Sequence, residues 1–490
     1  MTPGRRSARA ELERTCRRWG VLPRYRDALG KVRTVPDRSL RRILALLGGP
    51  EASGNSRGST PPVRRPVRPI DVVTIAHEGV PPRIALHRPR STRGATLPWS
   101  IRLEGGRVIQ GSIPPVDHRP APSGGRAPRR EHLDVREPLP SGYHRLEVTT
   151  PSGTATSLLL TVPARPRAPA ARSAPRAWGL FAPLYALHDR QTWGCGDFSA
   201  LERFVAWAAD HGATVVGTLP ILSAFLDRPY DPSPYRPVSR TFWNEVFLDV
   251  TREPEYEGSE PVQRIVASAD FQNELERLRS REYVDLRRVA RLKRQVLEGM
   301  LAQLRSRPSR RSAELDRFPG KENRLAAYAR FRAEMEVHRR PPRSREEAPS
   351  DPSVPTDREA AARADYHRYV QWLSTRQLEA VSRFGRSRNV DLYLDVPLGT
   401  HPQGFDAWWE GPAIVSSASI GVPPDPGFPA GQNWGIAPAN PERLREEGYT
   451  AFVATVRKHL DIVRVLRIDH VMGIHRLFWI LNGTRARDGA

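Results

Sequence analysis

Val390-Asp391-Leu392-Tyr393-Leu394-Asp395-Val396-Pro397 is a short apolar run that ends in an acid and a proline. A run so rich in strand-forming residues predicts a β-strand over 390–396. Pro397 has no amide proton to give to a neighbouring strand, so it ends the strand and starts a loop. Asp395 is therefore expected at the carboxyl end of this strand.

Strands and helices alternate on both sides of this run. Further strands are predicted over 179–184, 214–219 and 465–469, and helices over 198–211 and 449–460. Residues 257–386 are mostly helical and charged, with a proline-rich break near 341–355. The alternation predicts a parallel sheet, either doubly wound or closed into a barrel, with its functional residues at the carboxyl ends of the strands.

The first third of the chain follows other patterns. Apolar residues at helical spacing predict a small helical module over 1–48, and a Gly/Ser/Pro/Arg-rich linker covers 49–68. Several short runs of β-branched and aromatic residues, separated by turn residues, predict a β-sandwich over 69–163. A second linker, 163–176, leads to the third domain, 177–490.

Composition excludes several classes of protein. The 490 residues include 77 Lys and Arg and 54 Asp and Glu, which gives a net charge of +23. This charge raises a nucleic-acid-binding hypothesis, but the arginines spread along most of the chain without a recognisable binding motif. The only cysteines, Cys16 and Cys195, exclude a disulfide-stapled fold and fit a reducing compartment. Since neither a signal segment nor a membrane-spanning run is present, we expect a cytoplasmic protein with no membrane partner.

The candidate site begins with Leu466-Arg467-Ile468-Asp469-His470, at the end of the last predicted strand. Residues two apart on a strand point to the same side, so Arg467 would keep the Asp469 carboxylate ionised and oriented. That arrangement suits a nucleophile. The alternative is an aspartate that caps the next helix, and this pentapeptide alone favours the cap. Asp395 has the same two interpretations, a group that binds a polar substrate or an ordinary turn residue.

Two loops combine aromatic rings with polar groups. Gly431-Gln432-Asn433-Trp434-Gly435 offers amide donors and an indole, and Ser233-Pro234-Tyr235 offers a phenol ring. A sugar presents hydroxyl groups at its rim and C–H groups on its face, which amides and aromatic rings match. The alternatives are an Asn-stabilised turn with a packed Trp434, and an ordinary turn at Tyr235.

Other chemistries lack their sequence motifs. The chain has no G-x-S-x-G, H-E-x-x-H, C-x-x-C, P-loop or G-x-G-x-x-G pattern. We therefore predict no metal and no cofactor. Cys195 is expected to be a buried structural thiol.

Several segments together carry a resemblance. They are Trp193-Gly-Cys-Gly-Asp197, Ser233-Pro-Tyr235 with Ser239-Arg240, Asp395-Val-Pro397, Gly421-Val-Pro-Pro-Asp-Pro426, Gly431-Gln-Asn-Trp-Gly435 and Arg467-Ile-Asp-His470 with Gly473. In this order they resemble the 4-alpha-glucanotransferases, also called amylomaltases or disproportionating enzymes. Tyr25-Arg-Asp-Ala28 and Gly142-Tyr-His-Arg-Leu146 resemble the long bacterial form of that family, so the similarity extends over essentially the whole chain.

The resemblance implies a multidomain protein with a helical module, a β-sandwich and a TIM-type barrel that carries helical insertions. It implies transfer of α-1,4-glucan segments to maltooligosaccharides or glucose, with retention of configuration and without a cofactor. By similarity, Asp469 matches the nucleophile and Arg467 the residue that orients it. The positions that match the substrate subsites are Ser233, Tyr235, Asp395, Gln432 and Trp434.

The same resemblance predicts that part of the enzyme is missing. A retaining enzyme needs a second carboxyl group as acid and base, about 5–5.5 Å from the first. The family places it after the next strand, beyond Ala490, and neither Glu245 nor Glu410 lies in a matching motif. We expect about half of the eight barrel strands, and hence a truncated, impaired enzyme. The alternative is a non-catalytic protein that binds α-glucans; the nucleic-acid hypothesis ranks last.

Overall fold

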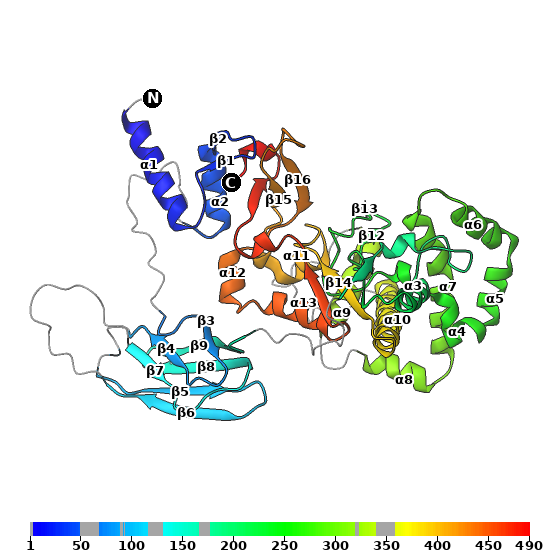
Figure 1. Cartoon of the computed structure of the whole chain (residues 1–490), viewed down its shortest axis with the longest axis horizontal. Coiled ribbons are helices and arrows are strands. Elements are labelled where there is room, and N and C mark those ends of the chain that lie inside the picture. Colours follow the sequence, from blue (N-terminus) through cyan, green and yellow to red (C-terminus); the bar gives the residue numbers. More distant parts are fainter. Residues whose placement is uncertain are drawn as a thin grey trace, which may run out of the picture. The chain divides into compact units, whose positions relative to one another are not determined.

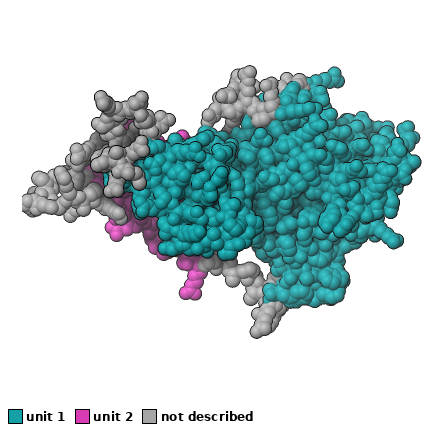
Figure 2. Space-filling view, turned by 90° about the horizontal axis from the view of Figure 1, so that it is seen from above, with its two compact units in different colours: residues 1–46, 176–440, 451–490 teal, residues 47–175, 441–450 magenta. Residues whose placement is uncertain are grey.

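The computed structural model describes residues 3–49, 68–88, 92, 94–115, 131–165, 177–318, 323–339 and 358–490. The chain divides into two compact units, shown in different colours in Figure 2. One comprises Met1–Leu46, Arg176–Asn440 and Ala451–Ala490, and the other Leu47–Pro175 and Pro441–Thr450. Most of the predicted linkers, 49–68 and 163–176, and the break near 341–355 lie outside the described residues.

The first unit is organised around a four-stranded parallel sheet. Its neighbouring strands, in order, are β10 (Gly179–Phe181), β11 (Val215–Gly217), β14 (Asp391–Val396) and β17 (Val465–Ile468). The predicted strands are confirmed, although each is shorter than expected. Within the described residues the sheet is open, so the closure of a barrel is not part of this structure.

Helices lie between the strands, as the alternation predicts. Helix α3 (Phe198–Asp210) follows β10 and begins at Asp197, whose carboxylate accepts the Ala200 N–H at 2.9 Å. Helix α13 (Thr450–Leu460) precedes β17. Side chains from α3, the sheet and the helices between β11 and β14 form one buried apolar core. No helix of the described residues has both the length and the apolar character needed to cross a membrane.

A group of helices is inserted between β11 and β14, close to the predicted 257–386. Its members are α4 (Pro254–Glu257), α5 (Glu260–Ala267), α6 (Ala269–Arg279), α7 (Leu286–Ser306), α8 (Arg310–Arg317), α9 (Asn323–His338) and α10 (Arg358–Ser387). Figure 1 shows α4 to α8 gathered beside the long α10. Two 3₁₀ turns, η3 (Glu245–Phe247) and η4 (Val250–Arg252), connect this group to the sheet region.

One lysine is fully buried in this insertion. Lys293 of α7 is 2% exposed, and its ammonium group donates hydrogen bonds to the carbonyl oxygens of Val246 and Leu248 at 2.7 and 2.6 Å. A buried charge is tolerated only where hydrogen bonds replace its water shell. Lys293 therefore fastens the chain around η3 to α7.

A second, antiparallel sheet carries part of the candidate site. Its strands are β16 (Gln432–Ile436), β15 (Ala418–Val422) and β18 (Phe478–Leu481), in that order. The sequence analysis assigned 431–435 to a loop, and this was wrong because Gln432–Ile436 is a strand. This short strand could not be recognised from the sequence, because Gly431 and Gly435 indicate a turn and the apolar residues do not alternate. The same unit also contains β12 (Phe225–Leu226), β13 (Tyr230–Asp231), α11 (Phe405–Glu410) and four 3₁₀ turns, η2 (Leu184–Ala186), η5 (Gly411–Ala413), η6 (Val471–Ile474) and η7 (Ala486–Asp488).

The N-terminal module is helical at both ends but contains a hairpin. Helices α1 (Pro3–Arg18) and α2 (Asp37–Leu46) enclose the antiparallel strands β1 (Arg24–Arg26) and β2 (Val32–Thr34). The sequence analysis predicted only helices here. Strands of three residues are too short to produce a periodic pattern, which is why the hairpin was missed.

The second unit contains the predicted β-sandwich. One sheet has five strands in the order β3 (Val73–His77), β9 (Gly153–Val162), β8 (Gly142–Thr150), β5 (Leu97–Arg102) and β6 (Val108–Ile113). The other pairs β4 (Arg83–Leu86) with β7 (Glu131–Asp134). Apolar side chains from both sheets form a shared buried core, as expected where two sheets pack face to face. Helix α12 (Pro441–Glu446) also belongs to this unit.

Candidate active site

Arg467 joins two carboxylates at the carboxyl end of the parallel sheet. It lies in β17, directly opposite Asp395 of β14 in the strand register. Its guanidinium group donates one hydrogen bond to Asp395 Oδ2 at 2.5 Å and another to Asp469 Oδ1 at 2.8 Å. Ionic hydrogen bonds of this kind are short and directional, so Arg467 fixes the positions of both acids.

Asp469 combines a fixed backbone with an accessible carboxylate. Its N–H donates to the Val396 carbonyl at 3.0 Å, which ties the end of β17 to the end of β14. Its side chain is 25% exposed. The cap of η6 is His470, which makes no side-chain capping bond. The helix-cap alternative for Asp469 therefore has no support in the structure.

Asp395 is the buried member of the pair. Its side chain is 1% exposed, and Oδ2 also accepts the Tyr235 hydroxyl at 3.4 Å. Among the described residues, Oδ1 has no hydrogen-bond partner. Burial raises the pKa of Asp395, although the positive charge of Arg467 acts in the opposite direction. Asp395 belongs to β14, so it is not the turn residue of the alternative interpretation.

Tyr235 lies beside these acids, and its environment disfavours the phenolate. Burial is the largest effect that raises the pKa of Tyr235, and the negative charges of Asp395 and Asp469 add to it. The phenol therefore stays neutral and can donate its proton to Asp395. This hydrogen bond brings Ser233-Pro234-Tyr235 to the ends of the parallel strands.

Trp434 reaches the same place from the antiparallel sheet. Its indole meets the His470 ring edge to face, with ring centres 5.1 Å apart, and His470 directly follows Asp469. Gly435 has φ +67°, and a Cβ at this position would lie 2.6 Å from Nη1 of Arg236. The positive φ favours glycine at this position, where β16 approaches the Arg236 side chain next to Tyr235.

The turn interpretation of the Gln432–Gly435 segment is partly right. Asn433 does stabilise a bend, because its side-chain oxygen accepts bonds from the Gly435 N–H at 3.0 Å and from Ser419 Oγ at 2.6 Å. Trp434 is nevertheless only half-buried and contacts His470. The sequence analysis did not name His470 as a candidate site residue, although His470 belongs to the same pentapeptide, 466–470, as Asp469.

Ser233 and Gln432 are less directly connected to the carboxylates. The Ser233 N–H donates to Asp231 Oδ1 at 3.3 Å, and Gln432 pairs with Val422 through the strand register. In the described part of the chain, neither side chain forms a hydrogen bond with Asp395 or Asp469. The structure thus brings together Arg467, Asp469, Asp395, Tyr235 and Trp434, and places Ser233 and Gln432 on the adjoining segments.

Glu245 and Glu410 do not join this cluster. Glu410 accepts a hydrogen bond from Arg324 at 2.8 Å, and Glu245 lies 4.0 Å from the guanidinium group of Arg332. Both are therefore committed to other arginines. The described residues also contain no group of three His, Cys, Asp or Glu side chains that could hold a metal ion.

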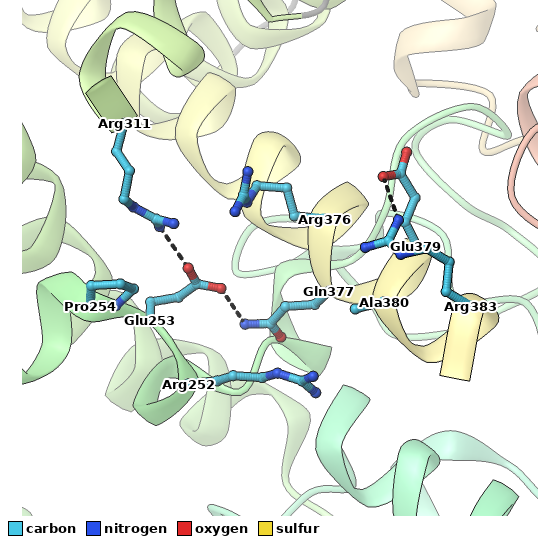
Figure 3. A pocket seen from close by; sticks show the side chains of 9 residues that line it. All are labelled: Arg252, Glu253, Pro254, Arg311, Arg376, Gln377, Glu379, Ala380 and Arg383. Atoms are coloured by element: carbon cyan, nitrogen blue, oxygen red, sulfur yellow. Dashed lines mark hydrogen bonds and ion pairs between the residues drawn. The ribbon is translucent and has the colours of Figure 1, made fainter. Parts of the chain in front are cut away.

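A separate cavity of about 380 Å³ lies between the inserted helices (Figure 3). Its lining residues are Arg252, Glu253, Pro254, Arg311, Arg376, Gln377, Glu379, Ala380 and Arg383. Each arginine is paired with a glutamate: Arg311 with Glu253 and Glu255, Arg376 with Glu314, Arg383 with Glu379 and Arg252 with Glu202. Each guanidinium group of the lining therefore has a carboxylate partner, although Glu202, Glu255 and Glu314 lie outside the lining itself.

The two thiols are expected to be inert in the folded protein. Both are buried, and burial raises the pKa of Cys195 to about 12 and also raises that of Cys16. Because the thiolate is the reactive form, the raised pKa and the burial of Cys195 both slow its alkylation at pH 8. Iodoacetamide at pH 8 should label neither cysteine in the native protein and both in urea, measured by mass spectrometry. Rapid labelling of the native protein would contradict the buried placement.

The fold indicates the class of this protein, and comparison with known proteins shows its family. A parallel sheet with polar and charged groups at its strand ends is typical of α/β enzymes. A family model described as 4-alpha-glucanotransferase matches residues 182–490, which is more than half of the chain. A model described as the MalQ N-terminal beta sandwich domain matches residues 69–163. The chain belongs to the 4-alpha-glucanotransferase family.

Individual relatives agree with this assignment. The 4-alpha-glucanotransferase of Mycobacterium tuberculosis is 30% identical over 498 residues, which covers 96% of this chain and 67% of the relative. The Haemophilus influenzae 4-alpha-glucanotransferase is 29% identical over 377 residues, covering 72% of this chain and 53% of the relative. The crystal structure of an amylomaltase from Corynebacterium glutamicum superposes with a TM-score of 0.77 at 26% identity, covering 98% of this chain and 68% of that one. The chain thus spans between half and two thirds of the length of these relatives.

Proposed function

We propose that this protein transfers α-1,4-glucan segments between maltooligosaccharides, or to glucose, by a retaining double displacement. In the first step, Asp469 attacks the anomeric carbon of the donor and forms a covalent glycosyl-enzyme, while the glycosidic oxygen takes a proton from a general acid and leaves as a hydroxyl group of the released glucan. In the second step, a hydroxyl group of the acceptor glucan attacks the same carbon, returns its proton to the conjugate base of that acid, and releases Asp469 as the carboxylate. Two inversions at one carbon give overall retention.

The observation that carries this proposal is the ion pair between Arg467 and Asp469. A nucleophilic carboxylate has to be ionised, oriented and open to the substrate at the same time. The 2.8 Å bond from Arg467 supports the first two requirements, and the 25% exposure of Asp469 supports the third.

The neighbouring side chains suit a glucose unit. The half-buried Trp434 and Tyr235 rings offer apolar faces for the C–H groups of a sugar. The unpartnered Oδ1 of Asp395 can accept a hydrogen bond from a sugar hydroxyl group, since a buried acceptor is stabilised by any donor that reaches it. We assign Gln432 and Ser233 to the same subsites, on the segments that carry Trp434 and Tyr235.

None of the described side chains is assigned as the general acid and base. Asp395 is the one described carboxylate that shares Arg467 with Asp469, and its burial and ion pairing suit substrate binding better than proton transfer. We infer further that the four parallel strands correspond to neighbouring strands of a (β/α)₈ barrel. The order of β10, β11, β14 and β17 in the sheet supports this, because it follows the order in the chain.

Binding of maltoheptaose tests the assignment of the subsites. The substitution Trp434→Ala removes the ring beside His470 and is expected to weaken binding about three- to tenfold, measured by isothermal titration calorimetry. Trp207→Ala is the matched control, because Trp207 is 51% exposed on α3 and, among the described residues, its ring contacts the rings of its neighbours Phe204 and His211. Equal affinity of both variants would contradict the assignment.

The same titration separates the transferase from a non-catalytic glucan-binding protein. Binding of maltoheptaose by the unmodified chain, without glucose or longer maltodextrins as products, would favour the binding protein. Absence of any binding would contradict both functions.

A further inference from the structure

The turn of the N-terminal hairpin is held rigidly by one buried carboxylate. The side chain of Asp27 is fully buried, and it accepts hydrogen bonds from the Lys31 N–H at 2.8 Å and from Arg33 Nε at 2.7 Å. The Asp27 N–H also donates to the Lys31 carbonyl at 2.9 Å. A turn with its polar groups satisfied in this way presents its outer residues in a fixed geometry.

Three interactions join this hairpin to the antiparallel sheet and to the segments that adjoin it. The Ala28 N–H donates to the Pro424 carbonyl at 3.1 Å. The Tyr25 hydroxyl donates to the Arg487 carbonyl at 2.8 Å, and the Tyr25 ring meets Phe478 edge to face at 5.2 Å. Figure 1 shows β1 and β2 next to β15 and β16, far along the sequence but close in space.

The contacted residues surround the segment that carries Trp434. Pro424 lies in the connection between β15 and β16. Phe478 of β18 pairs with Gly421 of β15, and Gly421 in turn pairs with Asn433 of β16, the residue before Trp434. The far end of the connection is Gly431, where a Cβ would lie 2.9 Å from the Cβ of Ala486. Ala486 adjoins Arg487, so the hairpin supports both ends of this connection.

We propose that Tyr25 is a positioning residue for Trp434. The hairpin restricts the motion of residues 423–431 and of β18. Because β15 pairs with both β18 and β16, this restriction extends to β16 and to the indole of Trp434. Tyr25 itself does not contact Asp395, Arg467 or Asp469, so it acts only through the antiparallel sheet. This inference rests on the proposed function for its effect on glucan binding, but its structural part can be tested without any ligand.

Hydrogen exchange measured by mass spectrometry on the full chain tests the structural part. Tyr25→Ala removes a hydrogen bond and an aromatic pair, so amide exchange in peptides covering 423–434 is expected to rise about five- to thirtyfold. Tyr25→Phe keeps the ring and should give a smaller rise. Tyr283→Ala is the matched control, since Tyr283 is 76% exposed. Unchanged exchange of 423–434 in Tyr25→Ala would overturn the inference, whatever the ligand results.

Maltoheptaose titration tests the functional part. Tyr25→Ala should weaken binding about threefold or more, Tyr25→Phe should restore part of the affinity, and Tyr283→Ala should have no effect. The role of Tyr25 in positioning Trp434 would be overturned if Tyr25→Ala showed faster amide exchange but unchanged affinity for maltoheptaose. This conclusion requires that Trp434→Ala does weaken binding. If the unmodified chain binds no maltoheptaose, the proposed function fails, and the exchange experiment alone supports or overturns the role of Tyr25.

Discussion

Replacing Asp469 with asparagine is expected to lower glycosyl transfer from α-maltotriosyl fluoride by at least about a thousandfold. The amide has nearly the shape of the carboxylate but is not a nucleophile. It also loses the ion pair with Arg467, which holds Asp469 Oδ1 at 2.8 Å. Fluoride leaves without being protonated, so this donor tests the nucleophile without requiring an acid. Release of fluoride and formation of longer saccharides are the measurements.

Asp461→Asn is the matched control for this substitution. Asp461 is an exposed aspartate in the turn between α13 and β17, outside the carboxylate cluster. It should react at the rate of the unmodified chain. A rate for Asp469→Asn within tenfold of that control would show that another group forms the glycosyl-enzyme. A failure of the unmodified chain to release fluoride would contradict the double displacement itself.

The largest expected effect on stability belongs to Lys293→Met. Methionine has a similar volume and fills the space, but it leaves the carbonyl oxygens of Val246 and Leu248 buried without donors. Each unsatisfied carbonyl costs about 1–3 kcal/mol, and removal of a buried charge offsets part of this. We expect the free energy of unfolding to fall by about 3 kcal/mol, measured by urea denaturation of the full chain.

Lys31→Met is the control for this measurement, because Lys31 is also a lysine but is exposed. It should leave the urea midpoint essentially unchanged. The two variants should share one m-value, since neither changes the area exposed on unfolding. Equal midpoints for both variants would show that the hydrogen bonds of Lys293 contribute nothing to stability.

Much of the parallel sheet follows from local sequence. Asp391–Val396 and Val465–Ile468 are apolar runs that end at Asp or Pro, and both fold as the strands that the pattern predicts. The placement of Arg467 and Asp469 on one side of the chain end also follows from residue spacing. These features depend on neighbours in the sequence, which is why the sequence alone contains them.

Features that depend on distant pairing were not predicted. Arg467 reaches Asp395 because the register of β14 and β17 sets these two residues opposite each other. No local sequence pattern fixes the register of two strands that are so far apart in the chain. The hairpin around Asp27 and the strand that carries Trp434 were missed for a related reason. Both are short, and tertiary contacts such as that of Tyr25 with Arg487 stabilise them.

The long insertion between β11 and β14 also determines the order in which this sheet can assemble. Val215 pairs with Asp391, so residues 218–390 must be synthesised before these two strands can meet. Compared with a usual crossover of about 30 residues, closing this loop costs only about 1.5 kcal/mol more, because the entropy grows with the logarithm of length. The kinetic consequence is larger, since pairings distant in sequence form slowly. We expect the inserted helices to collapse first on the ribosome, while the edge of β11 that does not face β10 stays unpaired until β14 emerges.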